Sequence, residues 1–304
     1  MKFTISSLTL VSLLVLIAPS KAAAFTAPDR GRLLLTGGVS ALDGAGGGGL
    51  STWALIGGLG TRDSFGIQAR HTTFMTRDYR LTSPGVSLGL FNRLEWSYAR
   101  LRLDETGGAL EGARIEMDSH GLKLRLFGDA VLDQDQPWPQ VSVGIQHKRN
   151  RGIQGLEGAG LRKATDVGAR RNSDVEYYIA ASKLLLARSV LLNGTVRFTR
   201  ANQFGLAGFG GELGDSREAQ FEGSIAWLLR RDLAVGVEFR SKPRNLALDR
   251  EDDAHSLFAA WAPTKHASVT LAYANVGPIV SGNATTPLNR SDQRGVYLSF
   301  QLGY

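Results

Sequence analysis

The sequence predicts an all-β protein, a transmembrane up-and-down antiparallel β-barrel of about 14 strands. Three observations predict this class: an export signal, segments in which apolar and polar residues alternate, and connections that are alternately short and long. In a strand that crosses a bilayer, alternation puts one side toward lipid and the other toward the lumen, because successive side chains point to opposite faces. Closure is expected because an open sheet would leave unpaired backbone groups in hydrocarbon.

The first 24 residues have the organisation of a cleavable signal peptide. Lys2 supplies a positive charge, residues 5–18 are apolar, and Ala22 and Ala24 are the small residues that signal peptidase accepts, so cleavage is expected before Phe25. A transmembrane anchor is the alternative, but the apolar run is shorter than the roughly 20 residues that span a bilayer. We therefore expect a signal peptide, residues 1–24, and one barrel domain, residues 25–304.

The C-terminal segment shows the alternation most clearly. Its apolar positions are Val296, Leu298, Phe300, Leu302 and Tyr304, separated by Tyr297, Ser299, Gln301 and Gly303. The same period recurs near residues 141–146, 195–199, 220–229 and 233–240. Strands are expected at residues 31–41, 50–60, 64–75, 81–91, 94–104, 117–128, 139–149, 174–186, 190–202, 218–229, 233–243, 253–263, 267–277 and 292–304.

The connections distinguish a membrane barrel from a soluble sandwich. Short turns are expected near residues 61–63, 92, 187–188, 230–232 and 263–265, and long loops near 103–118, 149–174, 202–217, 243–252 and 276–292. Short turns face the periplasm, and an even strand number places both termini there. Two segments fit poorly. Residues 31–49 are so rich in glycine that a lumenal segment, leaving 12 strands, is the alternative, and the 128–139 connection is long for a periplasmic turn.

Composition limits the chemistry of the mature chain. It has no cysteine, which excludes thiolate metal sites and cysteine nucleophiles, and we expect no metal and no cofactor. The formal net charge of +7 falls by two when Lys2 and Lys21 leave with the signal. The remaining charge is too small to predict nucleic-acid binding and is compatible with contact with anionic lipopolysaccharide.

Four segments carry a family resemblance: Arg32–Ser40 (RLLLTGGVS), Trp53–Gly58 (WALIGG), Gly60–Asp63 (GTRD) and Ser97–Arg100 (SYAR). They resemble an uncharacterised family of Gram-negative outer-membrane β-barrels catalogued as domain of unknown function 3034. The resemblance covers essentially the whole mature chain. It implies a barrel in the outer membrane and no particular activity, because the family assigns no functional residues that can be transferred to this sequence.

The C-terminus also has the general form of a barrel assembly signal. Phe300, Leu302 and Tyr304 place an aromatic residue last, after apolar residues at alternating positions. Such signals usually end in Phe, so Tyr304 is a departure. We expect the barrel assembly machinery and periplasmic chaperones to be partners. Aromatic residues near strand ends are expected in girdles at the membrane interfaces: Trp53, Phe91, Trp96, Trp138, Trp227, Trp261 and Tyr304.

Two motifs that could indicate enzymatic or nucleotide chemistry are weak. Gly44, Gly46 and Gly49 have the spacing of a dinucleotide-binding loop but lack its βαβ context, so close backbone packing is the better interpretation. The segments 118–120 (DSH) and 252–256 (DDAHS) leave a minor hypothesis of an outer-membrane hydrolase. Adjacent residues on a strand point to opposite faces, so neither serine is expected to reach its histidine. We therefore predict no catalytic residues.

Charged residues on strands are expected to point into the lumen, because a charge facing mid-bilayer lipid costs about 2–4 kcal/mol. The candidates for a lumenal constriction are Lys123, Arg125, Lys148, Arg197, Arg240, Glu95, Glu176, Glu222 and Glu238. They could form a salt-bridged interior that only stabilises the barrel, or a constriction that selects solutes by charge. The residues alone do not separate these possibilities.

The leading functional hypothesis is a pore or transporter for small solutes of unknown identity, because about 14 strands give a wider barrel than the filled eight-stranded type. The second is a closed structural or surface-interaction barrel that binds lipopolysaccharide through a loop rich in arginine, a residue that binds phosphate bidentately. The contact candidates are Arg149, Arg151, Arg162, Lys163, Arg170 and Arg171.

Overall fold

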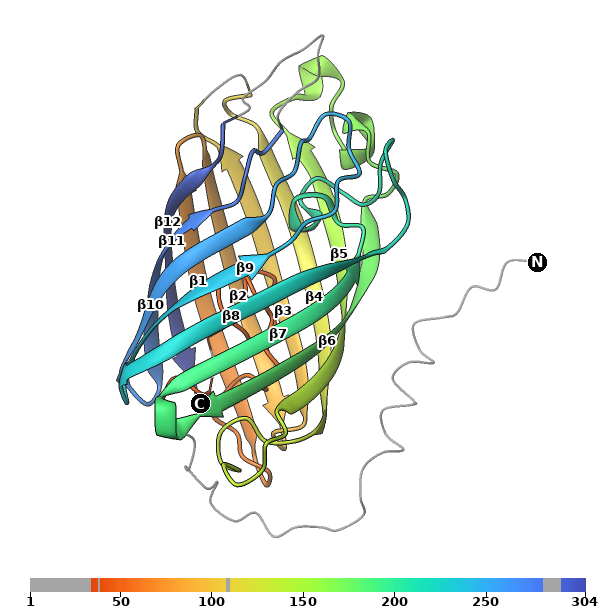
Figure 1. Cartoon of the computed structure of the whole chain (residues 1–304). Helices are drawn as coiled ribbons and strands as arrows, with labels where there is room; N and C mark the ends of the chain where they lie inside the picture. The colour runs from red at the N-terminus through yellow and green to blue at the C-terminus, as the bar shows by residue number, and fades with distance from the viewer. Residues whose placement is uncertain (1–33, 38, 108–109, 281–290) are drawn as a thin grey trace, which may run out of the picture.

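The structure, a computed structural model, describes residues 34–37, 39–107, 110–280 and 291–304. Within these residues twelve strands form one closed antiparallel barrel, in which β12 closes on β1. Short turns lie at one end of the barrel and long loops at the other (Figure 1). The strands are β1 Phe65–Thr76, β2 Tyr79–Leu90, β3 Leu94–Glu105, β4 Arg114–Phe127, β5 Gln140–Gln154, β6 Ser173–Leu185, β7 Val190–Thr199, β8 Glu218–Arg230, β9 Leu233–Arg240, β10 Ala254–Thr264, β11 Ala267–Asn275 and β12 Arg294–Gly303.

Side chains alternate between the two faces of the wall as the sequence predicts. In β12, Phe300 and Leu302 are exposed on the outer face, whereas Ser299 and Gln301 are buried on the inner face. Every strand contributes large exposed apolar side chains in this way. A continuous apolar belt around a closed wall is suited to hydrocarbon and not to water. The chain is therefore an outer-membrane β-barrel.

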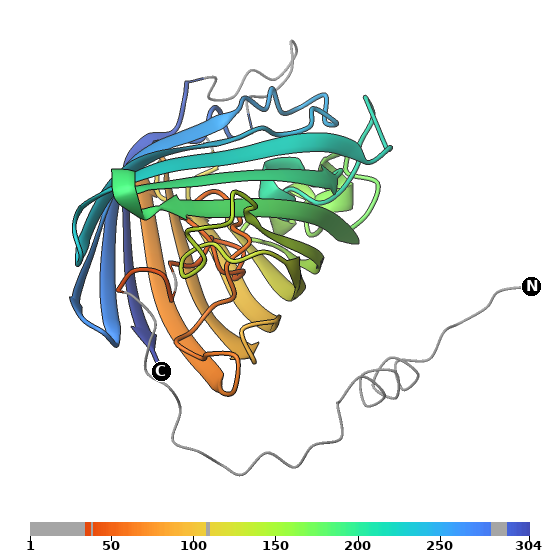
Figure 2. The same ribbon diagram turned by 60° about the horizontal axis from the view of Figure 1, so that its bottom comes forward.

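Two of the fourteen expected strands are wrong, and the twelve-strand alternative is confirmed. Residues 39–58, called the lumenal segment below, lie inside the barrel (Figure 2). They form only isolated bridges, Ser40 with Gly46 and Gly47 with Thr52. The expected strand 50–60 therefore belongs mainly to this segment, and the expected turn at 61–63 connects the segment to β1. Residues 31–33 of the other expected strand, and the expected signal peptide, lie outside the described residues.

The remaining short turns are confirmed near residues 91–93, 186–189, 231–232 and 265–266. The helical turns are 3-10 helices: η2 Glu157–Ala159, η3 Ala164–Val167, η4 Leu186–Arg188 and η5 Asn202–Gly205. Among the described residues no helix is long and apolar enough to cross a membrane. The C-terminus lies at the end with the short turns, as expected for the periplasmic end (Figure 1).

The long 128–139 connection is an ordered exception at the short-turn end. The Lys183 ammonium donates to the carbonyl oxygens of Asp133 at 2.6 Å and Gln136 at 2.9 Å. The backbone N–H of Leu184 donates to the Ala130 carbonyl at 2.7 Å. A single cation that gathers several carbonyl groups explains how a connection longer than a hairpin turn remains compact.

Candidate functional site

The lumenal segment enters and leaves the barrel at the short-turn end. Gly37 lies directly against Leu59, and the Leu59 N–H donates to the C-terminal carbonyl of Tyr304 at 3.2 Å. The segment packs closely because glycines remove side chains at its contacts with the wall. A Cβ on Gly89 of β2 would clash with the Gly57 carbonyl oxygen. The segment can therefore be viewed as a loop inserted from the periplasmic end (Figure 2).

Glu95 and Lys123, from neighbouring strands β3 and β4, bind the backbone of the segment as a pair. The Lys123 ammonium donates to the carbonyls of Gly46 at 2.9 Å and Leu55 at 2.8 Å and lies 3.2 Å from the Glu95 carboxylate. Glu95 accepts from the N–H groups of Gly46 at 2.9 Å and Gly57 at 2.7 Å. Both side chains are buried. The two charges thus satisfy each other and four backbone groups of the segment.

Two more glutamates accept from backbone N–H groups at the tip of the segment. Glu238 of β9 accepts from Leu50 N at 3.0 Å and from the Ser51 hydroxyl at 2.7 Å. Glu222 of β8 accepts from Thr52 N at 2.7 Å. An ionised carboxylate is a strong acceptor for such groups. Glutamates separated from the segment by more than 160 residues in the chain therefore fix the position of its tip.

Asp43 of the segment lies among three cations of the wall. Its carboxylate is 3.3 Å from Lys148, 3.4 Å from Arg240 and 3.9 Å from Arg197. Arg197 also pairs with Glu222 at 2.5 Å, and it pairs with Glu176 at 2.9 Å. This cluster, called the lumenal charge cluster, contains three cations and three carboxylates: Lys148, Arg197, Arg240, Asp43, Glu176 and Glu222. Its formal charge is zero only while Asp43 is present.

Neutral polar side chains of the wall bind the remaining carbonyl groups of the segment. Thr195 donates to the Thr52 carbonyl at 2.6 Å, and Ser142 donates to the Ala54 carbonyl at 2.7 Å. Nearer the periplasmic end the contact becomes apolar, where Trp53 and Leu55 pack in one cluster with wall residues such as Leu184. The segment therefore contacts the wall through polar groups in the middle of the lumen and through apolar groups at its periplasmic end.

Eight of the nine candidate constriction residues point inward, are buried and belong to these contacts. They are Lys123, Lys148, Arg197, Arg240, Glu95, Glu176, Glu222 and Glu238. Arg125 differs, because it donates to the Gly128 carbonyl and pairs with Asp129 at 3.0 Å in the 128–139 connection. Arg70 donates to the Leu42 carbonyl at 2.9 Å and was not among the predicted constriction residues. Arg70 lies at an inward position of an expected strand, so the same alternation could have identified it.

The serine and histidine residues of the hydrolase hypothesis lie on opposite faces of the wall. Ser119 is buried inside, whereas His120 is exposed outside; Ser256 is inside and His255 outside. Neither pair can form the serine–histidine hydrogen bond that nucleophilic catalysis requires. Among the described residues, no three histidine, aspartate or glutamate side chains are grouped so that they could hold a metal ion.

The basic residues of the lipopolysaccharide hypothesis are all exposed. Arg149 and Arg151 project from the outer face of β5, near the long loops, and Arg162, Lys163, Arg170 and Arg171 lie in the following loop. Arg171 pairs with Asp215 and Arg151 with Asp118, the latter at 2.9 Å. Arg149 has no ion pair among the described residues. Contact of these six residues with lipopolysaccharide remains a prediction.

The expected assembly residues lie where the barrel closes. Phe300 and Leu302 face outward on β12, and Tyr304 is exposed with its ring 6.2 Å from that of His266. Their recognition by assembly machinery remains a prediction. Among the aromatic residues expected in the interfacial girdles, the prediction for Trp53 is wrong, because its side chain is buried in the lumen. The side chains of the others are exposed.

The chain is similar to several solved outer-membrane proteins. The NanC porin aligns with a TM-score of 0.49 and 10% identity over 78% of this chain and 98% of that one. The KdgM porin aligns with a TM-score of 0.47 and 10% identity over 79% of this chain and 99% of that one. Outer membrane phospholipase A from Escherichia coli aligns with a TM-score of 0.38 and 10% identity over 78% of this chain and 92% of that one. These similarities are too low to transfer a function.

A search of curated proteins gives no match to the chain. The sequence profile of one family, described as "Protein of unknown function (DUF3034)", matches residues 36–301. The match begins at the lumenal segment and ends in the strand that closes the barrel. The family therefore includes the segment inside the lumen as well as the wall around it, and the chain belongs to this family, DUF3034.

Proposed function

We propose that the protein is a gated channel or transporter for small polar solutes, in which withdrawal of the lumenal segment opens the path. One observation carries this proposal: the wall binds the middle of the segment mainly through charged and polar side chains. Such contacts can be replaced by water when the segment leaves, whereas an apolar wall would resist wetting. Buried ion pairs are also poor means of stabilising a permanently filled interior, since well-packed apolar groups are often equally good or better.

The path of the segment permits such a movement. Both of its ends lie at the periplasmic end, and its bonds to the wall are side-chain contacts instead of strand pairing. It can therefore leave without opening the hydrogen-bonded wall, which would cost several kcal/mol per unpaired group in lipid. The second candidate function is a closed structural barrel. It is favoured by the apolar packing of Trp53 and Leu55 at the periplasmic end of the lumen.

A reversible lock distinguishes the two functions. The hydroxyl oxygens of Ser51, in the segment, and Ser224, in the wall, are in direct contact. Because the chain has no cysteine, a Ser51→Cys/Ser224→Cys variant has a single possible disulfide. In planar bilayers, the oxidised variant is expected to be silent, and the reduced variant is expected to show channel events like those of the unmodified barrel. Ser51→Cys alone is the matched control and should be insensitive to oxidant.

Deletion of residues 39–58 provides the complementary measurement. If the segment is the gate, the deleted barrel should conduct continuously once its fold is checked by heat-modifiable mobility on gels. If the unmodified barrel and the reduced double-cysteine variant show no channel events, and only the deletion barrel conducts, the closed structural barrel is favoured. A folded deletion barrel that does not conduct would contradict the proposal that withdrawal of the segment opens the path.

A further inference from the structure

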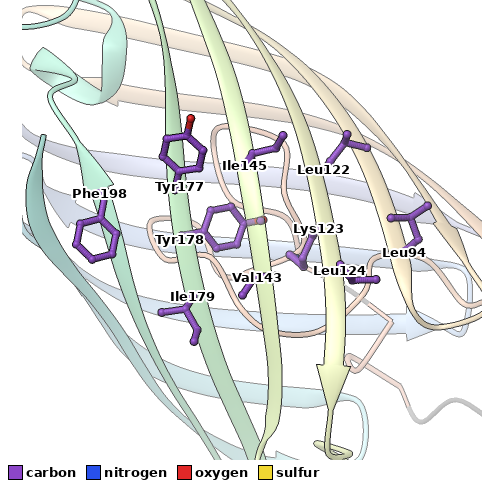
Figure 3. A pocket seen from close by; sticks show the side chains of 11 residues that line it. Leu94, Leu122, Lys123, Leu124, Val143, Ile145, Tyr177, Tyr178, Ile179 and Phe198 are labelled. Atoms are coloured by element: carbon purple, nitrogen blue, oxygen red, sulfur yellow. The ribbon is translucent and has the colours of Figure 1, made fainter. Parts of the chain in front are cut away.

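The lipid-facing wall contains a hollow that the lumenal function does not use. It has a volume of about 410 Å³ and lies on the outer face of β3 to β7. The backbone of Gly144 in β5 lies in its floor, and the ring of Tyr178 packs against this glycine from the inner side of the wall. Outward apolar side chains border it, as Figure 3 shows: Leu94, Leu122, Leu124, Val143, Ile145, Tyr177, Ile179 and Phe198.

The strand register orders the residues between this hollow and the long loops. One cross-strand row within the hollow contains Leu122, Ile145 and Tyr177. The next outward row toward the loops contains Tyr98, His120 and His147, with the rings of Tyr98 and His120 4.8 Å apart. The row after that contains Arg100, Asp118 and Arg149. Rows on one face are about 6–7 Å apart, because a strand rises roughly 3.3 Å per residue.

The row of charges has an excess of cations. Asp118 accepts from both Arg100 and Arg151 at 2.9 Å, so one carboxylate serves two arginines. Arg149 stands beside them without an ion pair among the described residues. Both paired arginine side chains are 45–46% exposed, which leaves guanidinium donors available to an anion. At the other side of the hollow, Arg217 lies 5.5 Å over the ring of Tyr177.

We propose that one lipopolysaccharide molecule of the outer leaflet binds here, with an acyl chain in the hollow and a lipid A phosphate on Arg149 and Arg151. An apolar hollow, an aromatic and histidine row and a cationic row follow one another as the acyl chains, sugars and phosphates of lipid A do. Arginine binds phosphate bidentately, and the cations here span several strands, which suits a headgroup larger than that of a phospholipid. The site places the contact on the barrel wall instead of on the loop that follows β5, and it is independent of whether the lumen opens.

Two pairs of variants test the site on the full-length mature barrel in detergent, with lipopolysaccharide as the probe. Arg149→Ala/Arg151→Ala is expected to weaken binding about tenfold or more, because charge-assisted hydrogen bonds are lost. The control, Arg162→Ala/Lys163→Ala, removes the same charge from the loop and should change affinity less than twofold. Ile145→Trp fills the hollow and should weaken binding severalfold, whereas Leu257→Trp, on the outer face of β10, should not.

The outcomes are distinguishable from failure to fold, because each variant is first checked by heat-modifiable mobility. Equal binding by Arg149→Ala/Arg151→Ala and the unmodified barrel would overturn the proposal. An equal loss of lipopolysaccharide affinity in Arg162→Ala/Lys163→Ala would show that the loop, and not the wall, makes the contact. Phosphatidylglycerol should bind at least tenfold more weakly than lipopolysaccharide, and equal binding would show a general site for anionic lipid in place of the one proposed.

Discussion

Two clusters of buried charge lie in the same barrel but differ in composition. The lumenal charge cluster sets three cations against three carboxylates in the middle of the barrel. The second cluster lies among the long loops and sets one cation, Lys242, against Asp249 and Glu251. Gln203 joins this loop cluster, accepting from Lys242 at 3.1 Å and donating to Asp249 at 2.8 Å and to Glu251 at 2.9 Å.

The loop cluster is sensitive to pH because its two carboxylates are buried beside one cation. In the loop cluster, burial and the nearby Asp249 raise the pKa of Glu251 to about 8, and burial raises the pKa of Asp249 to about 6. One carboxylate oxygen of each has no hydrogen-bond partner in the structure. In the lumenal charge cluster each carboxylate faces at least one cation at close range. Burial beside a single cation thus makes the loop cluster titrate near neutral pH, whereas the lumenal charge cluster has as many cations as carboxylates.

The largest expected effect comes from removing the central cation of the lumenal charge cluster. Arg197 is fully buried and holds Glu176 and Glu222 together. Arg197→Met should lower the free energy of unfolding by about 3–5 kcal/mol, since it leaves buried carboxylates without their partner. Urea unfolding of the barrel in lipid vesicles measures this. Arg62→Met is the control, because the Arg62 side chain is 74% exposed; an equal loss in both variants would contradict the central role of Arg197.

The next effect concerns the loop cluster. Glu251 and Asp249 have folded-state pKa values above those of free carboxyl groups, so their contribution to stability is full at low pH and is lost as pH rises through about 6 to 8. Hydrogen exchange in residues 242–251 should therefore be at least tenfold faster at pH 8.5 than at pH 5, after correction for intrinsic exchange. Glu251→Gln, which stays neutral, should flatten this dependence. An unchanged dependence in that variant would assign it to other groups.

Local sequence patterns predicted the wall, but for the lumen they predicted only, as an alternative, that the glycine-rich residues 31–49 lie inside. The strand β12 and the turn near Asn92 follow from alternation and turn residues that lie within a few positions of one another. Residues 50–60 also have an apolar pattern, and Trp53 within them resembled a girdle residue. Whether such a segment joins the wall or fills the lumen depends on partners distant in the chain, such as Glu238 for Leu50. No local period encodes that choice.

The candidate site was also predicted only in part: its inward charges were predicted, but their partners were not. The inward charges were found because lipid excludes them from the other face, a rule that applies residue by residue. Their partner Asp43 was not found, because the glycine content of residues 31–49 suggested a lumenal segment as an alternative but does not indicate which wall residues a carboxylate in it would contact. The excess of cations on the outer face of β3 to β5 was also missed, since it appears only when the register aligns Arg100, Asp118 and Arg149 across three strands.

The smallest expected effect is a weak ion preference of the barrel from which residues 39–58 are deleted. Removal of the segment takes away Asp43 and leaves wall cations Arg70, Lys123, Lys148, Arg197 and Arg240 facing Glu95, Glu176, Glu222 and Glu238. The wall then has one more cation than anions, so chloride should pass slightly more readily than potassium. The preference should be small because the charges are mixed and salt screens them over about 10 Å at 0.1 M.

The reversal potential in a potassium chloride gradient measures this ion preference. Arg70→Gln in the same deleted barrel should bring the preference close to zero, whereas Arg62→Gln, outside the lumen, should leave it unchanged. A strong preference for cations would mean that charges of the long loops, and not those of the lumen, control the path.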